Sequence, residues 1–355
     1  MRPFLKNVQA LRFVAAAMVV IQHVTDQLTI HPLPGMTPYV DPTGIKWWDG
    51  ADVFFVISGF IMYFLTHDRF GKKGYSKAFL KLRLMRVVPL YWVFTTVMLL
   101  VVWTSRDSVV HADTSPIYVA SSYFFVPMGR LDGMVVPLLL PGWTINHELF
   151  FYAMFAVALL APRAIALAGM VGFSLILVWL NPFLPAGALR FWSDPMLLEF
   201  IAGVGLGVLF VEGVRAPYLV SAAAILLAIV LFSVLPSALN GPPQALVGGA
   251  PAFLLAAGVI LAKPVPVWRP AVIMGDASYS LYLCHPFVIA GTAILWRKLH
   301  LPASAPLFGA GMFVGALGIS LIVYLGLERP LLGWMRRPAA ANKLAFAPSK
   351  LAPQA

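Results

Sequence analysis

Long apolar runs separated by short polar stretches dominate the chain. A helix needs about 20 mostly apolar residues to cross the hydrocarbon core of a bilayer, and runs of that length recur from one end to the other. The pattern predicts an all-α fold, a polytopic transmembrane helical bundle of about ten spans. The predicted spans lie near residues 8–30, 49–66, 85–104, 140–161, 163–181, 194–212, 216–235, 243–262, 273–296 and 304–327.

The remaining segments refine this picture. Segment 116–128 is too short to cross the bilayer, so we expect it to lie at the interface or to re-enter. Residues 1–335 are expected to form one membrane domain. Residues 336–355 have too few apolar side chains to build a core and are predicted to be a disordered cytoplasmic tail. Arg12 interrupts the first apolar run, which argues against a cleaved signal peptide.

Composition and charge exclude a soluble protein. Hydrophobic residues make up 60% of the 355 residues and charged residues only 11%, whereas soluble proteins keep about a quarter of their residues charged. The net charge of +11 follows from topology rather than from nucleic-acid binding, because the basic residues lie in loops. An N-terminus placed inside assigns 19 of the 25 Lys and Arg residues to the cytoplasm. The positive-inside rule therefore predicts that both termini are cytoplasmic.

The first span carries two polar residues, Arg12 and His23, inside an apolar helix. They are eleven residues apart, which is three helical turns plus about 20°, so both side chains project from one face at depths about 16 Å apart. Such residues are costly in a membrane unless they meet polar partners or water. We therefore expect this helix to face a polar cavity that the other spans enclose.

A pair of arginines marks the beginning of the third span. Arg83 and Arg86 are three residues apart and share a helix face. Paired guanidinium groups are well suited to phosphate recognition, so one interpretation is a phosphate-rich ligand arriving from the cytoplasm. The other interpretation is contact with membrane headgroups.

Carboxylates occur near the beginnings of two other spans. Asp52 is expected either to face the outer side of the cavity or to cap its helix. His147 and Glu148 point about 100° apart, so only one of them can face the cavity directly. We choose Glu148 because of the motif resemblance given below. A buried carboxylate can exchange protons, or it can pair with an arginine that only holds the bundle together.

The ninth span brings hydroxyls and a second imidazole into the membrane. Ser278, Tyr279 and His285 are candidates for substrate binding, although His285 precedes Pro286 and can alternatively bond a backbone group. Ala277 interrupts any Gly-Asp-Ser motif, so Ser278 is not expected to be a nucleophile. The single cysteine, Cys284, has no disulfide partner and no companion for a metal site, and no metal is expected.

These motifs together resemble the acyltransferase 3 family of integral membrane acyltransferases, and within it the bacterial exopolysaccharide O-acetyltransferases. The resemblance covers roughly residues 5–335, although Thr144 stands where the family commonly has serine. Many relatives carry an added esterase-like domain, for which we expect no room here. The motifs occur in the family order: NVQALRFVAAAMVVIQH, GADVFFVISGF, RLMRVVPLYW, GWTINHELFFY, SYSLYLCHP and ERP.

The resemblance implies an enzyme of the bacterial inner membrane. It implies transfer of an acyl group, usually acetyl, from cytoplasmic acyl-CoA to a sugar hydroxyl of an envelope glycan or exopolysaccharide, or of its lipid-linked precursor. Polysaccharide assembly proteins are possible partners. Arg12 and His23 match the family's essential pair, Arg83 and Arg86 match its CoA phosphate-binding pair, and Glu148 matches its acidic residue.

On this basis we expect acetyl-CoA to extend its pantetheine arm, about 15–20 Å long, toward His23. His23 acts as general base or transiently accepts the acyl group. Glu148 orients His23 or takes up the proton, and Arg12 stabilises negative charge or binds a phosphate. Two alternatives remain open. Intramembrane charges also mark proton-coupled transporters and lipid-linked saccharide flippases. A structural subunit of an export complex would leave the buried charges unexplained.

Overall fold

The computed structural model describes residues 3–37, 39–104, 113–130, 133–235, 247–263 and 266–340, and within these ranges the regular structure is helical. The chain divides into two compact units. Of the described residues, the first unit contains those of 3–57 and 212–331, and the second contains those of 58–211 and 332–340. The boundary between Ile57 and Ser58 lies inside a helix, so the two parts of that helix belong to different units.

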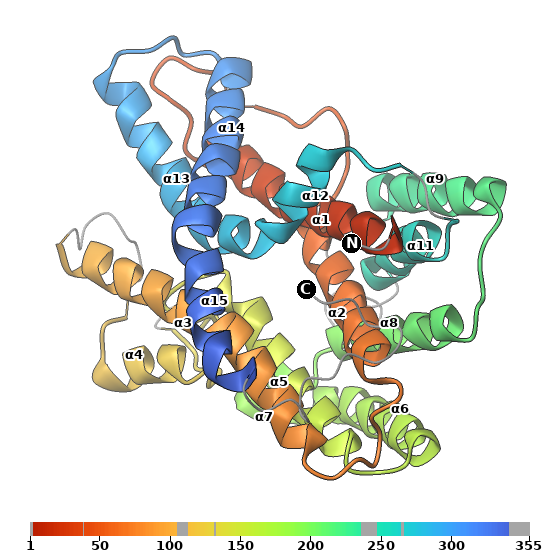
Figure 1. Cartoon of the computed structure of the whole chain (residues 1–355). Coiled ribbons are helices and arrows are strands. Elements are labelled where there is room, and N and C mark those ends of the chain that lie inside the picture. The colour runs from red at the N-terminus through yellow and green to blue at the C-terminus, as the bar shows by residue number, and fades with distance from the viewer. Residues whose placement is uncertain are drawn as a thin grey trace. The chain divides into compact units, whose positions relative to one another are not determined.

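The first unit is built on the N-terminal helix α1 and on the C-terminal helices. Within it α13 packs along α14, α9 along α11, and α1 along α12 (Figure 1). Its elements are α1 (Pro3–Ile30), the 3-10 turn η1 (Trp47–Asp49), the start of α2 (Gly50–Thr66), α9 (Tyr218–Val234), α11 (Gly249–Ile260), α12 (Arg269–Asp276), α13 (Ser278–Lys298), α14 (Ala305–Val323) and the π-helical turn η4 (Tyr324–Glu328).

The second unit contains the remainder of α2 and the middle of the chain. In this unit α5 packs against α3, α6 and α8, and α6 also packs against α8. Its elements are α3 (Tyr75–Thr104), α4 (Pro116–Tyr123), α5 (Gly142–Ala158), α6 (Arg163–Leu180), η3 (Asn181–Phe183), α7 (Ala188–Trp192) and α8 (Met196–Val211), together with most of α15 (Arg329–Ala340), which begins in the first unit.

Seven segments in the described part of the chain are long and apolar enough to cross a membrane. The helices α9 and α11 are apolar but shorter, and α5 has only 17 residues. The polytopic helical fold is therefore confirmed, whereas the count of ten spans and the cytoplasmic termini stay predictions. The seven are Lys6–Ile30, Trp47–Thr66, Tyr75–Thr104, Arg163–Phe183, Ala188–Val211, Ser278–Lys298 and Ala305–Met335.

Several element ends differ from the predicted spans. The helix that carries the third span begins at Tyr75, ten residues before the predicted position 85, because its first turns are helical but basic. The ninth span begins at Ser278 rather than near residue 273, since Ala277 separates α12 from α13. Segment 116–128 contains only the eight-residue α4. Helix α15 runs to Ala340, and residues 341–355 of the predicted tail lie outside the described residues.

The core of the first unit fixes which face of α1 is buried. Four apolar residues of α1 at spacings of four, from Ala16 to Leu28, form a buried stripe. This stripe packs against α13 and α14 through Leu281, Ile289, Phe308, Met312 and Ala316. His23 precedes Val24 of this stripe by one position, about 100° around the helix, so it flanks the packed face.

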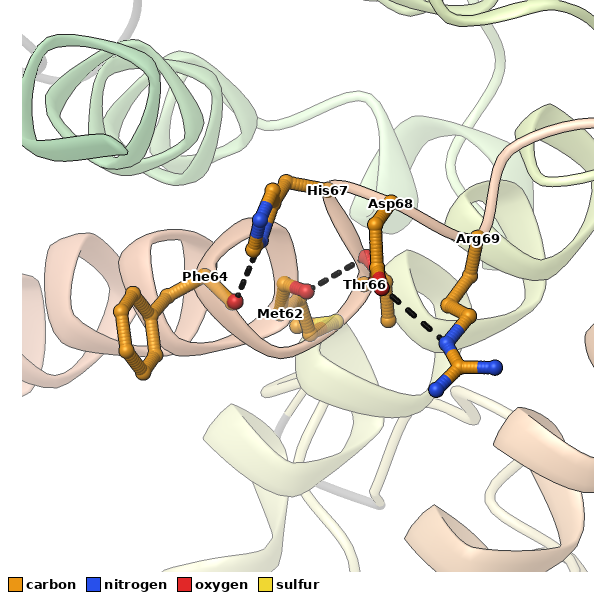
Figure 2. A network of polar contacts seen from close by, with 6 residues as sticks. All are labelled: Met62, Phe64, Thr66, His67, Asp68 and Arg69. Carbon is orange, nitrogen blue, oxygen red and sulfur yellow. Dashed lines mark hydrogen bonds and ion pairs between the residues drawn. The ribbon is translucent and has the colours of Figure 1, made fainter. Parts of the chain in front are cut away.

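In the second unit, side chains at and just after the end of α2 form polar contacts there (Figure 2). Thr66 Oγ1 donates to the Met62 carbonyl at 2.7 Å, and His67 Nδ1 lies 2.9 Å from the Phe64 carbonyl. Arg69 Nε then pairs with Asp68 Oδ1 at 3.3 Å. The Phe64 carbonyl is one that the last helical turn leaves without an intrahelical donor, so the His67 contact contributes to capping the end of α2.

Candidate active site

Arg12 begins a chain of hydrogen bonds from α1 to α12. Its Nη1 donates to Gln9 Oε1 at 3.1 Å, and Gln9 Nε2 donates to Asp276 Oδ1 at 2.6 Å. Gln9 thus bridges the Arg12 guanidinium and the Asp276 carboxylate, which are far apart in sequence. The polar partners that Arg12 was predicted to need include Gln9, and through it Asp276.

The approach of α1 to α12 depends on Gly275. A Cβ at this position would overlap the backbone carbonyl of Gln9, so no larger residue fits without moving the helices apart. The glycine therefore brings Gln9 within reach of Asp276, the residue that follows Gly275.

His23 lies between an exposed and a buried aromatic side chain. Its ring centroid is 4.9 Å from that of Trp48 and 4.7 Å from that of His285, in both cases edge to face. Its Nδ1 is 2.9 Å from the Val19 carbonyl oxygen. Because a carbonyl can only accept, the neutral imidazole carries its proton on Nδ1 and has its lone pair on Nε2.

His285 repeats this arrangement on α13. It has no exposed surface, and its Nδ1 lies 3.2 Å from the Leu281 carbonyl. One nitrogen therefore bonds a backbone group, as the structural alternative supposed. The other nitrogen, Nε2, is buried and has no hydrogen-bond partner among the described residues. A buried polar atom without a hydrogen-bond partner is energetically costly, so packing alone does not explain His285.

The other candidate residues on the ninth span lie in different surroundings. Ser278 is wholly buried, and its hydroxyl has no partner among the described residues. Ser280 donates to Glu328 Oε2 at 2.5 Å, which ties α13 to the π-helical turn. Tyr279 is partly exposed. Cys284 is a buried free thiol, as expected.

Asp52 lies in the first turn of α2 and is only 6% exposed. Its carboxylate is so close to Gly248 that a Cβ there would overlap Oδ2. A carboxylate in a first helical turn is stabilised by the helix dipole, which agrees with the capping interpretation.

Glu148 is the centre of a polar cluster in the second unit. Its Oε1 accepts a hydrogen bond from Ser58 Oγ at 3.0 Å and another from the Tyr152 hydroxyl. Tyr152 is one helical turn from Glu148 on α5, whereas Ser58 comes from α2. Glu148 therefore has two hydroxyl donors, and neither was identified from the sequence.

Arg83 extends this cluster toward α3. Its guanidinium carbon lies 5.5 Å from the ring centroid of Phe79 and 5.8 Å from that of Tyr152. Arg83 and Arg86 both interact electrostatically with Tyr152. The predicted arginine pair and Glu148 are thus brought together around one tyrosine, within one unit.

His147, the neighbour of Glu148, points into aromatic surroundings instead. Its ring stacks on Phe191 with centroids 4.1 Å apart and meets Trp143 edge-on at 6.0 Å. Glu148 accepts the two hydroxyl hydrogen bonds described above, and its assignment as the cavity-facing residue of the two stays a prediction. Thr144, the departure from the family motif, bonds the Pro141 carbonyl of its own turn.

The candidate residues are thus divided between the two units. Arg12, His23 and His285 belong to the first unit, and Glu148, Arg83 and Arg86 to the second. The predicted contact between His23 and Glu148 therefore stays a prediction. No group of three or more His, Cys, Asp or Glu residues in the described ranges could hold a metal ion.

Comparisons with known proteins agree on one family. The acyltransferase 3 family model, an acyltransferase domain, matches residues 5–325. The exopolysaccharide production protein ExoZ of Rhizobium meliloti (strain 1021) is 34% identical over 299 residues, which cover 82% of this chain and 92% of the relative. No solved structure matches the chain significantly. Together with its apolar helices, these matches show that the protein is a multi-pass membrane acyltransferase that belongs to the acyltransferase 3 family.

Proposed function

We propose that this protein transfers an acetyl group from cytoplasmic acetyl-CoA to a hydroxyl of an exopolysaccharide sugar or of its lipid-linked precursor, in the bacterial inner membrane. One observation carries the chemistry. Because His23 donates its Nδ1 proton to the Val19 carbonyl, its Nε2 has a lone pair that can accept a proton. The family supplies the reaction class, and the name of the ExoZ relative supports an exopolysaccharide acceptor.

The reaction needs a base for the acceptor hydroxyl. His23 Nε2 takes the hydroxyl proton as the oxygen attacks the thioester carbonyl, so that an O–H bond breaks and a C–O bond forms. The C–S bond then breaks, and the CoA sulfur leaves as a thiolate that takes up a proton. In the alternative route, His23 attacks first and carries the acetyl group before the sugar hydroxyl accepts it.

His285 is a second base beside His23. The ring of His285 lies against that of His23, and its buried Nε2 has no hydrogen-bond partner among the described residues. Both Nδ1 atoms are held by backbone carbonyls, which orient the rings and keep both Nε2 atoms available. His285 is therefore assigned to stabilising the imidazolium of His23.

The donor is held through its phosphates by Arg83 and Arg86. The Arg83 guanidinium lies near two aromatic rings, which restrict its orientation, and a restricted guanidinium favours bidentate contacts with phosphate oxygens. Glu148 in the same cluster balances this positive charge. Arg12 is assigned to the negative charge that develops at the reacting carbonyl.

The function is tested with purified protein in lipid nanodiscs. The protein is incubated with acetyl-CoA labelled in the acetyl group and with oligosaccharides from alkali-deacylated host exopolysaccharide, whose hydroxyls are free. Free CoA thiol and labelled, alkali-labile glycan should appear in equal amounts. His23→Ala should abolish both while the protein still inserts. Absence of glycan label with the wild-type protein would refute the acceptor class, and unimpaired transfer by His23→Ala would refute the role of His23.

A further inference from the structure

Trp48 is a large aromatic residue that contacts His23 and remains half exposed. Its exposed fraction is 46%, whereas the other ring against His23, that of His285, is completely buried. Within the first unit, the His285 side of His23 is therefore closed by packed side chains. Of the two rings beside His23, only that of Trp48 offers surface to a ligand.

Bonds from the preceding loop hold the turn that carries Trp48. Trp47 Nε1 donates to Asp41 Oδ2 at 2.7 Å, and Asp49 N donates to the Lys46 carbonyl at 3.2 Å. Lys46 N in turn donates to the Phe232 carbonyl of α9 at 3.1 Å. Trp48 is thus placed by both of its sequence neighbours, so little side-chain or backbone freedom is lost when a ligand packs on it.

We propose that Trp48 is the platform on which the acceptor sugar ring stacks. Pyranose rings have a face of C–H groups that packs on an indole face, and their hydroxyls project from the rim. A ring seated on Trp48 would direct a rim hydroxyl toward His23, whose ring is 4.9 Å away. The inference rests on the proposed function and adds to it the place where a hexopyranose acceptor binds.

The test separates acceptor binding from chemistry. Initial rates are measured with deacylated exopolysaccharide oligosaccharides as the varied acceptor at saturating acetyl-CoA, and then with the two substrates exchanged. Trp48→Ala should raise the KM for the oligosaccharide about tenfold, because a well-stacked aromatic contact contributes about that factor to binding. Trp48→Phe, which keeps a smaller aromatic face, should recover part of the loss. The KM for acetyl-CoA should change less than twofold in either variant.

Trp268→Ala is the matched control. Trp268 is 72% exposed, so the substitution removes a comparable surface indole from the same unit. It should leave both KM values at their wild-type level. If Trp48→Ala had a wild-type KM for the oligosaccharide, the platform would be refuted. The same would hold if kcat fell while the KM for the oligosaccharide stayed unchanged, because Trp48 would then only hold His23 in place. Because the wild-type protein labels the glycan in both of these outcomes, they are distinct from failure of the proposed function.

Discussion

His23 and His285 meet edge to face with ring centroids 4.7 Å apart, and each imidazole holds its Nδ1 against a backbone carbonyl of its own helix. Two neighbouring rings therefore present two Nε2 lone pairs and no N–H group between them. This relationship places a second neutral imidazole beside His23, the base of the proposed reaction.

The first prediction follows from this pair. Replacing His285 by Gln removes the second acceptor but keeps a polar side chain, so kcat should fall about 10- to 100-fold, while the KM for acetyl-CoA changes little. Steady-state kinetics in nanodiscs measure both constants. Cys284→Ala is the control, because Cys284 is also buried on α13 and has no assigned role. Equal kinetics for His285→Gln and Cys284→Ala would contradict the role of His285.

The arginine pair leads to a second prediction. Arg83→Ala and Arg86→Ala should each raise the KM for acetyl-CoA about tenfold or more and leave the KM for the oligosaccharide unchanged, since a charge-assisted contact with phosphate is lost. Lys77→Ala and Lys81→Ala remove cations of the same helix whose side chains are exposed. If the lysine variants raised the acetyl-CoA KM as much, general attraction would explain the effect. A normal KM in both arginine variants would exclude phosphate binding there.

The third prediction concerns the support of Glu148. Tyr152→Phe removes one of its two hydroxyl donors and leaves a partly buried carboxylate oxygen less satisfied, which costs about 1–3 kcal/mol. The midpoint of thermal unfolding in detergent should therefore fall. Tyr152→Phe combined with Glu148→Gln should recover part of this loss, because the neutral amide needs less stabilisation. If the double variant were no more stable than Tyr152→Phe, the hydroxyl would not serve the carboxylate.

Much of the fold could be predicted from the lengths of the apolar runs alone. The spans near 8–30, 49–66, 163–181 and 304–327 correspond to helices with matching apolar segments, because crossing a bilayer requires a continuous run that composition reveals directly. The first ten residues of α3 were missed, since hydropathy indicates where a helix is apolar and not where it begins. The break at Ala277 was also missed. Pro286 lies in a helix without ending it, whereas Ala277 ends one without any breaker residue.

The site was predicted in part. The apolar surroundings of Arg12 and His23 identified them as residues that need polar partners. Helical spacing showed that His147 and Glu148 cannot both face one cavity, and the family resemblance favoured Glu148. The partners themselves depend on tertiary packing. Gln9 and Asp276 are 267 residues apart, and Ser58 and Glu148 are 90 residues apart, so no local pattern relates them. Trp48 was not identified as a site residue from the sequence, because its contact with His23 depends on how η1 packs on α1.

The fourth prediction tests the link between α1 and α12. Gly275→Ala places a methyl group against the Gln9 carbonyl, so the helices must separate at a cost of about 1–3 kcal/mol and the Gln9–Asp276 bond must lengthen. Both the unfolding midpoint and kcat should fall. Gly291→Ala on α13 is the matched control, since a Cβ there meets no atom within 4 Å. Unchanged stability in Gly275→Ala would show that the helices do not depend on this close approach.

The fifth prediction concerns the carboxylate that anchors the turn next to Trp48. Burial alone would raise the pKa of Asp41, but hydrogen bonds from Thr43 N, Thr43 Oγ1 and Trp47 Nε1 outweigh it and lower the pKa below its ordinary value of 3.8. A carboxyl group whose pKa is lower in the folded state adds stability above its unfolded pKa. This stability is lost as the pH falls through the lower, folded pKa.

The difference in unfolding midpoint between the wild-type protein and Asp41→Asn should therefore be constant above about pH 5 and should shrink as the pH falls below 3.8. Thermal unfolding in detergent between pH 3 and pH 7 measures it. Asp113→Asn is the control, because Asp113 also accepts a backbone hydrogen bond, from Ser115, but lies in a loop of the other unit. If Trp48 is the sugar platform, Asp41→Asn should also raise the KM for the oligosaccharide at neutral pH, whereas Asp113→Asn should not. A loss of stability in Asp41→Asn that grew toward low pH would contradict the sign of this argument, since protonation removes the same charge that the substitution removes.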